Sequence, residues 1–181
     1  MTACKYGWVR LAALAVTALM GLLFAGCGAI REASTRDKVI REETANFVYA
    51  VPIEKIWPEA KAMFALRGFD IADDTGDRSA GAYLFTTSWK LTRASSSSTS
   101  SSMCTSRERF VVRGTKVEGG ARVEVTGSTQ RSCGSEDYRD SFPSRRDPYR
   151  ELDLIKRVEP KRGEEIVAKA SAAGGEARKG E

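Results

Sequence analysis

A β-hairpin is the feature of this sequence that most constrains its fold. Apolar and polar residues alternate along Ala121–Thr126, Arg109–Val117 is a second strand-forming run, and the turn-forming segment Glu118-Gly119-Gly120 separates the two. If Glu118 and Gly119 are the two turn residues, Val112 faces Val125 across the hairpin. We therefore predict two antiparallel strands whose register is set by this turn.

The same register, extended away from the turn, brings Cys104 opposite Cys133. Bonded cysteines need Cα atoms roughly 4.4–6.8 Å apart, and directly facing residues meet that requirement. A turn at Gly119-Gly120 instead would offset the two cysteines by one pair. We expect a disulfide between Cys104 and Cys133, with a pair of free thiols as the alternative.

The other periodic segments indicate short strands and amphipathic helices. Trp57 and Trp89 fall on the apolar faces of a helix and a strand, and both are predicted core residues. We expect an α+β fold, a mainly antiparallel sheet with one long helix packed on it and a C-terminal helix. The predicted elements are strands at Phe47–Val51, Phe69–Ala72 and Gly81–Leu91, a helix from Ile53 to Arg67, and a helix that Asp147 and Pro148 open and that resumes after Pro160.

The first residues have the layout of a secretory signal. Lys5 and Arg10 precede Leu11–Ala25, an uncharged apolar stretch that is shorter than the roughly 20 residues a membrane-spanning helix needs. The segment Phe24-Ala25-Gly26-Cys27 follows at its border. It resembles the lipobox of bacterial lipoproteins, in which the cysteine is acylated and becomes the new N-terminus.

That resemblance implies that residues 1–26 are a lipoprotein signal peptide and that Cys27 carries acyl chains, palmitate among them. Each buried methylene contributes about 0.8 kcal/mol, so more than one chain gives stable anchoring. Gly28 follows the cysteine, where an aspartate would resemble the inner-membrane retention signal of enterobacterial lipoproteins. We expect the outer membrane, on its periplasmic face. An ordinary cleaved signal and a retained membrane anchor are the alternatives.

Beyond the leader, the chain has the length of one domain. Residues 27–45 are polar and charged and are expected to form a flexible tether. A single α+β domain is predicted over 46–170, and a disordered tail over 171–181, where two glycines are adjacent. The serine-rich run Ala94–Ser102 is expected to be a mobile loop between two strands.

One stretch resembles a known family of envelope proteins. VPIEKIWPEAKAMFALRGFDI, at residues 51–71, has a strand end, a proline, a helix with a tryptophan and a glycine-aromatic exit, and GAYLFTTSW follows at 81–89. This pattern is similar to the helix-grip domain of BamC-like lipoproteins of the outer-membrane barrel-assembly machinery and of related envelope lipoproteins. The resemblance implies a helix packed on an antiparallel sheet over residues 46–130, and it carries over no catalytic residue.

The composition excludes several kinds of chemistry. The chain has no histidine, which removes histidine-based triads and histidine zinc sites. Asp73, Thr75 and Asp77 are spaced like calcium ligands, but they lack the glycine and the distant glutamate of a calcium loop and are expected to form a solvated turn. We predict no metal, no cofactor and no catalytic residue. The 29 basic and 24 acidic residues are interleaved without a basic stripe, so no nucleic-acid partner is predicted.

Two functions follow from these features. The first is a non-enzymatic envelope lipoprotein that acylated Cys27 holds at the bilayer, with a small periplasmic domain that binds a protein partner in outer-membrane assembly or maintenance. The alternative is a small-molecule carrier or enzyme that uses a groove between the long helix and the sheet. Its sign would be an apolar pocket with convergent polar groups.

Overall fold

The computed structural model describes residues 29–96, 103–134 and 136–179 of the 181-residue chain. These residues form an α+β fold with a mostly antiparallel sheet. Arg41–Glu165 form one compact unit, and residues 29–40 with Ile166–Lys179 belong to a second. A first helix covers residues 29–45, followed by α2 (Ile53–Leu66), β1 (Ile71–Thr75), β2 (Ala82–Thr87), β3 (Lys90–Ser96), β4 (Met103–Val117), β5 (Gly120–Cys133), β6 (Arg139–Arg146), α3 (Pro148–Val158) and α4 (Pro160–Lys179).

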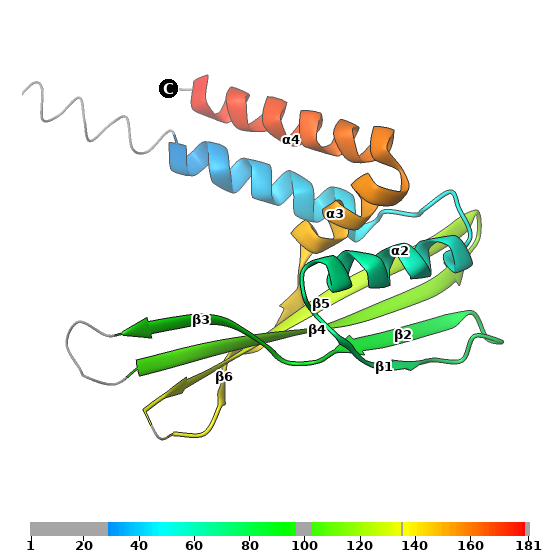
Figure 1. The fold of residues 1–181 in the computed structure, drawn as a ribbon. Coiled ribbons are helices and arrows are strands. Elements are labelled where there is room, and N and C mark those ends of the chain that lie inside the picture. The colour runs from blue at the N-terminus through cyan, green and yellow to red at the C-terminus, as the bar shows by residue number, and fades with distance from the viewer. Residues whose placement is uncertain (1–28, 97–102, 135, 180–181) are drawn as a thin grey trace, which may run out of the picture. The chain divides into compact units, whose positions relative to one another are not determined.

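The strands form one sheet in the order β1-β2-β4-β5-β6, and β3 also pairs with β4 (Figure 1). β4 is 15 residues long, which leaves room for two partners on one edge. β2 pairs with Val111–Thr115, and β3 pairs with Met103–Glu108. The sheet is therefore assembled around the long hairpin of β4 and β5.

The register of that hairpin agrees with the prediction. Val117 pairs with Gly120, which makes Glu118-Gly119 the two-residue turn, and Val112 pairs with Val125. Both strands are longer than the sequence pattern indicated, because each continues to its cysteine. A single choice of turn thus fixed every pair along the hairpin.

Gly120 lies where the hairpin meets the segment before α2. Its φ of 155° is in the region that favours glycine, and a Cβ atom there would lie 1.8 Å from the carbonyl oxygen of Tyr49. Tyr49 and Ala121 exchange two backbone hydrogen bonds, of 2.8 and 3.1 Å. The strand predicted at Phe47–Val51 is reduced to this one bridge.

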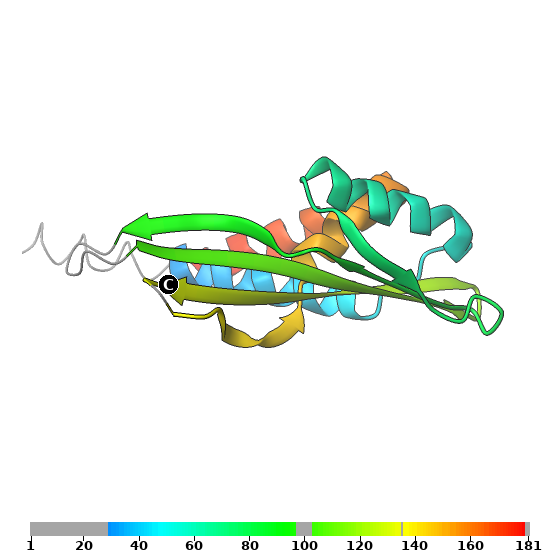
Figure 2. The same ribbon diagram turned by 60° about the horizontal axis from the view of Figure 1, so that its bottom comes forward.

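The core lies between α2 and the sheet. Phe64 packs at ring-centroid distances of 5.8 Å from Phe85 and 5.1 Å from Phe110. Figures 1 and 2 show α2 and α3 on the same face of the sheet. The predicted apolar face of α2 is confirmed, since all of its members are buried: Ile53, Ile56, Trp57, Ala60, Met63 and Phe64.

The helix ends also follow the sequence signals. Asp147 caps α3, because its side chain accepts a 3.1 Å hydrogen bond from the Arg150 backbone amide, and Pro148 occupies the first turn. Gly68, after α2, has a φ of 72°, as a left-handed helix exit requires.

The alternation of Gly81–Leu91 predicted that Trp89 and Leu91 share a buried face with Phe85. Phe85 is buried, but Leu91 is 65% exposed. Trp89 is half-buried and contacts arginine side chains on the sheet face turned away from α2. The prediction of a core residue is therefore correct for Trp57 and wrong for Trp89.

An extra residue between β2 and β3 explains this difference. Thr86 pairs with Val111 and Lys90 with Glu108, so four steps along this segment span three steps along β4. Side chains of a strand point alternately to the two faces, and one inserted residue moves every later side chain to the other face. Lys90 consequently lies on the helix side, over the Phe69 ring.

The second unit corrects two predictions about the ends of the domain. A flexible tether was expected over 27–45 and a disordered tail over 171–181, but residues 29–45 are helical and α4 continues to Lys179. Within this unit, Glu32 lies 3.7 Å from Arg178, and a Cβ atom on Gly174 would lie 2.7 Å from Arg36. The glycine allows a close antiparallel approach of the two helices, which stabilises segments with few large apolar residues. Within the described segments, no helix combines the length and hydropathy needed to cross a membrane.

Candidate functional site

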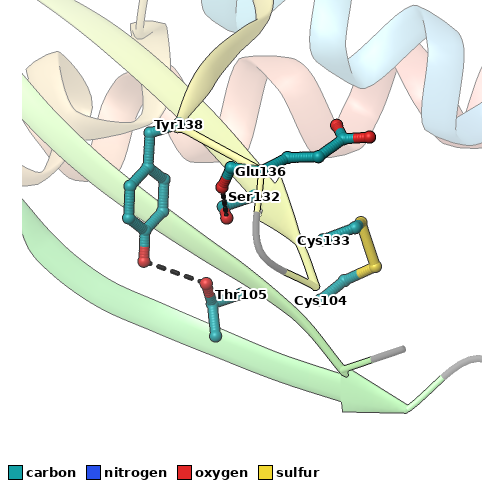
Figure 3. Close-up of a disulfide and its surroundings, with 6 residues drawn as sticks. All are labelled: Cys104, Thr105, Ser132, Cys133, Glu136 and Tyr138. Carbon is teal, nitrogen blue, oxygen red and sulfur yellow. Dashed lines mark hydrogen bonds between the residues drawn. A yellow bond between two sulfur atoms is a disulfide. The ribbon is translucent and has the colours of Figure 1, made fainter. Parts of the chain in front are cut away.

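Two of the three predicted site cysteines meet in the structure. Cys104 and Cys133 face each other at the far end of the β4–β5 hairpin, with their sulfur atoms 2.10 Å apart (Figure 3). The predicted pairing at disulfide distance is thus confirmed. Cys27 and the signal peptide lie outside the described residues, as does most of the serine-rich run, of which Ala94–Ser96 belong to β3.

Aromatic side chains fill the centre of the helix–sheet interface. The Trp57 ring lies 5.3 Å from that of Tyr83 and 5.0 Å from that of Phe85. Gly114 lies beneath them, and a Cβ atom there would lie 2.8 Å from Ile53 Cδ1. Side chains therefore occupy the place where the carrier or enzyme hypothesis required a pocket.

A groove does lie beside this interface, at the end of α2. It has a volume of about 400 Å³ and is open to solvent. It is lined by Arg67, Phe69, Lys90, Leu91, Thr92, Glu108 and Arg150. The basic members already have partners, since Arg67 pairs with Asp153 at 2.6 Å and Lys90 donates to the carbonyl oxygen of Arg67. These contacts fix the side chains that form the groove wall. The ion pair also offsets the charge of Arg67.

The acidic turn after β1 holds the fold together locally. Asp77 Oδ1 accepts hydrogen bonds from the Ser79 side chain and from the Ser79 and Ala80 amides, which lower the pKa of Asp77. The solvated turn predicted over Asp73, Thr75 and Asp77 is confirmed only for Asp77, because Asp73 and Thr75 are exposed residues of β1. Among the described residues, no group of three or more potential metal ligands gathers here or elsewhere.

Asp74, in β1 just before this turn, was not singled out from the sequence. It accepts a 3.2 Å hydrogen bond from Trp57 Nε1 and pairs with Lys61 and Arg78. Burial alone would raise the pKa of Asp74, but the hydrogen bonds from Lys61 and Trp57 outweigh it and lower the pKa. The end of β1 is thereby attached to α2.

Glu151 of α3 is the most buried carboxyl group of the described chain, with 2% of its surface exposed. Burial raises its pKa, while the ion pair with Arg146, at 2.6 Å, opposes that effect. Arg146 also donates to the carbonyl oxygens of Thr44 and Ala45. A buried carboxylate that accepts from a backbone amide and a guanidinium is a structural anchor.

An arginine–aromatic stack lies on the sheet face turned away from α2. Arg107 and Arg109 flank Glu108 along β4, and because Phe110 points into the core, these arginines point to the other face. Their Cζ atoms lie 4.9 and 4.7 Å from the centroid of the Trp89 ring, and Arg107 lies 3.9 Å from the Tyr138 ring. We call Arg107, Arg109, Trp89 and Tyr138 the arginine–aromatic stack.

Polar neighbours hold one end of the stack. Nε and Nη2 of Arg107 both donate to Gln130 Oε1, at 3.0 and 2.8 Å, and Gln130 donates in turn to Asp140. The Tyr138 hydroxyl is hydrogen-bonded to Thr105 at 2.9 Å (Figure 3). Arg107 is therefore fixed in direction by an amide and an aromatic ring.

The other arginine has no such partner. Arg109 Nε is buried without a hydrogen-bond partner. No carboxylate of the described residues forms an ion pair with Arg107 or Arg109, whereas Arg67 and Arg146 each have one. Sequence patterns did not indicate this stack, because the predicted alternation placed Trp89 on the opposite face of the sheet.

Comparison with known proteins adds no relative. No family model, no curated protein and no solved structure matches this chain.

Proposed function

We propose that this protein is a non-enzymatic lipoprotein of the bacterial cell envelope. Acylated Cys27 anchors it to the outer membrane on the periplasmic side, and the α+β domain binds a protein partner. The observation that carries this proposal is the pairing of Cys104 with Cys133 at disulfide distance in a chain whose leader ends in Phe24-Ala25-Gly26-Cys27. Disulfides persist in oxidising compartments such as the periplasm, which is where such a leader directs a chain.

The arrangement of α2 on an antiparallel sheet supports the second part of the proposal. It is the architecture that the BamC-like helix-grip resemblance implies, and it favours a role in outer-membrane assembly or maintenance. The filled interface around Trp57 and Phe85 favours binding at the surface over binding in an internal pocket. The fold alone does not define a function, so the partner has to be argued from a surface.

Metabolic labelling with a fatty-acid analogue tests the anchor. The wild type is expected to incorporate label and to fractionate with the outer membrane, and Cys27→Ser is expected to lose the label. Cys4→Ser is the matched control, because it removes a cysteine of the leader and leaves the lipobox intact. Continued labelling of Cys27→Ser would refute the proposal. Loss of label in Cys4→Ser would show that the acyl chains depend on a cysteine other than Cys27.

The second candidate function is a small-molecule carrier or enzyme. The groove of about 400 Å³ beside α2 favours it, since this volume is in the range of ligand sites. A hydrolase or transferase activity that Glu108→Gln abolishes, with unchanged unfolding temperature, would support this function over the first. Unaltered activity in that variant would exclude the groove as its source.

A further inference from the structure

We infer that the arginine–aromatic stack is a docking surface for an acidic, extended segment of a protein partner. This inference rests on the proposed function and names the chemistry of its partner. Both guanidinium groups are oriented before any partner binds, Arg107 by Gln130 and Tyr138 and Arg109 by the Trp89 ring. Such preorganisation lowers the entropic cost of binding a carboxylate.

The charges of the stack are uncompensated. Arg107 and Arg109 lie two positions apart on one strand face, and like charges this close destabilise each other. Neither has a carboxylate partner among the described residues, and Asp140, the acid in the same hydrogen-bond network, is bonded to Gln130. The buried, unpartnered Nε of Arg109 is a donor for which the domain supplies no acceptor. An incoming carboxylate would supply the missing negative charge.

The spacing selects the form of the partner. Alternate residues of a strand are about 6.6–6.8 Å apart, and an extended segment with acids at alternate positions repeats at the same distance. One such segment can therefore present a carboxylate to Arg107 and another to Arg109. The planar guanidinium fork favours this bidentate pairing over a simple charge contact.

The packing argues against two other anionic partners. Arg107 and Arg109 both lie against the Trp89 ring, and Arg107 also covers the ring of Tyr138. Nucleic-acid bases need free aromatic faces on which to stack, and guanidinium groups already lie over the rings of Trp89 and Tyr138. A half-buried indole held between guanidinium groups is likewise not placed to enter a bilayer interface.

The test uses the mature, full-length lipoprotein in a non-ionic detergent. The probe is a synthetic peptide of alternating serine and glutamate, and the readout is tryptophan fluorescence, to which Trp89 contributes from within the stack. We expect a saturable change. Arg107→Gln and Arg109→Gln should each weaken the affinity by about tenfold, as expected for one charge-assisted contact. Arg109→Lys should weaken it almost as much, because lysine keeps the charge but not the planar fork.

Arg131→Gln is the matched control. It removes the same charge from β5, but Arg131 is next to Gln130 and points to the opposite sheet face. We expect its affinity to change less than about twofold, since long-range charge effects are screened. Circular dichroism and unfolding temperature of each variant establish that the fold is intact.

Three results would overturn the inference. The first is the absence of saturable peptide binding to the wild type, and the second is an equal loss of affinity in Arg131→Gln. The third is tighter, Arg109-dependent binding of inorganic phosphate or of phosphatidylglycerol vesicles than of the peptide, which would assign the stack to phosphate groups. None of these results alters fatty-acid labelling at Cys27, so failure of the docking surface and failure of the lipoprotein proposal remain distinguishable.

Discussion

The Glu151 carboxylate accepts a 3.0 Å hydrogen bond from the backbone amide of Val125, which links α3 directly to the middle of β5. The same oxygen accepts from Arg146 Nε at 2.6 Å. Arg146 in turn donates to the Thr44 carbonyl oxygen at 2.9 Å, so one buried carboxylate connects a helix, a strand and the segment before α2. Such a group stabilises the fold only while both of its donors are present.

We expect Glu151→Ala to lower the free energy of unfolding by about 3–5 kcal/mol, because it leaves the Arg146 charge and the Val125 amide without their acceptor. Urea denaturation measures this loss. Glu151→Gln should cost less, because its amide oxygen can still accept from Val125. The control is Glu165→Ala, an exposed position where the change should stay within about 0.5 kcal/mol. Equal stability of Glu151→Ala and Glu165→Ala would contradict the assignment.

Loss of the Cys104–Cys133 bond should lower the free energy of unfolding by about 3–4 kcal/mol, because the bond closes a loop with a sequence separation of 29. Denaturation with and without reductant measures it, and the double variant Cys104→Ser, Cys133→Ser should behave like the reduced wild type. Reductant should leave that variant unchanged. Two reactive thiols in the denatured, unreduced mature protein would show that the bond does not form.

Two glycine substitutions should change stability in opposite directions. Gly114→Ala places a methyl group 2.8 Å from Ile53 and 3.0 Å from Trp57, and we expect a loss of about 1–3 kcal/mol from overpacking under α2. Gly175→Ala meets nothing within 4 Å and lies inside α4, so it should raise stability by up to about 1 kcal/mol. Thermal unfolding of both variants measures the contrast. A neutral Gly114→Ala would mean that α2 does not pack this closely.

The Glu54–Lys116 pair should make stability depend on pH in the acid range. The hydrogen bond from Lys116 lowers the pKa of Glu54 from 4.5 to about 2, with a further contribution from Tyr83. A carboxyl group with a lowered pKa in the folded state contributes stability above its unfolded pKa and loses it as the pH falls towards the folded value. The unfolding temperatures of the wild type and Glu54→Gln should therefore converge between pH 4.5 and about 2. When both proteins also carry Lys116→Gln, their unfolding temperatures should no longer converge. A difference between the wild type and Glu54→Gln that stays constant as the pH falls would contradict the prediction.

Local patterns were sufficient for the hairpin, the buried face of α2 and the cap of α3. The Glu118-Gly119 turn sets the register of every later pair, and it therefore also places Cys104 opposite Cys133. The buried side of α2 follows from helical spacing alone, because residues three or four positions apart lie on the same side of a helix. Each of these predictions depends on residues whose relative positions are fixed by one regular element or one turn.

The candidate docking surface could not be predicted in this way. One extra residue between β2 and β3 moves Trp89 to the face of Arg107 and Arg109, and no alternation within Gly81–Leu91 indicates where that residue is inserted. The pairing of Arg107 with Gln130, by contrast, belongs to the hairpin register that the turn sets.

The sequence by itself determined the buried face of α2, the hairpin register and the cysteine pairing, because these depend on spacing along the chain. Only the tertiary structure decided that residues 29–45 and 171–179 are helical, that Glu151 bonds Val125, and that Arg109 lies unpaired over Trp89. Marginal helices and buried charges are stabilised by partners far away in sequence. The free energy of those contacts exists only once the chain has folded and brought the partners together.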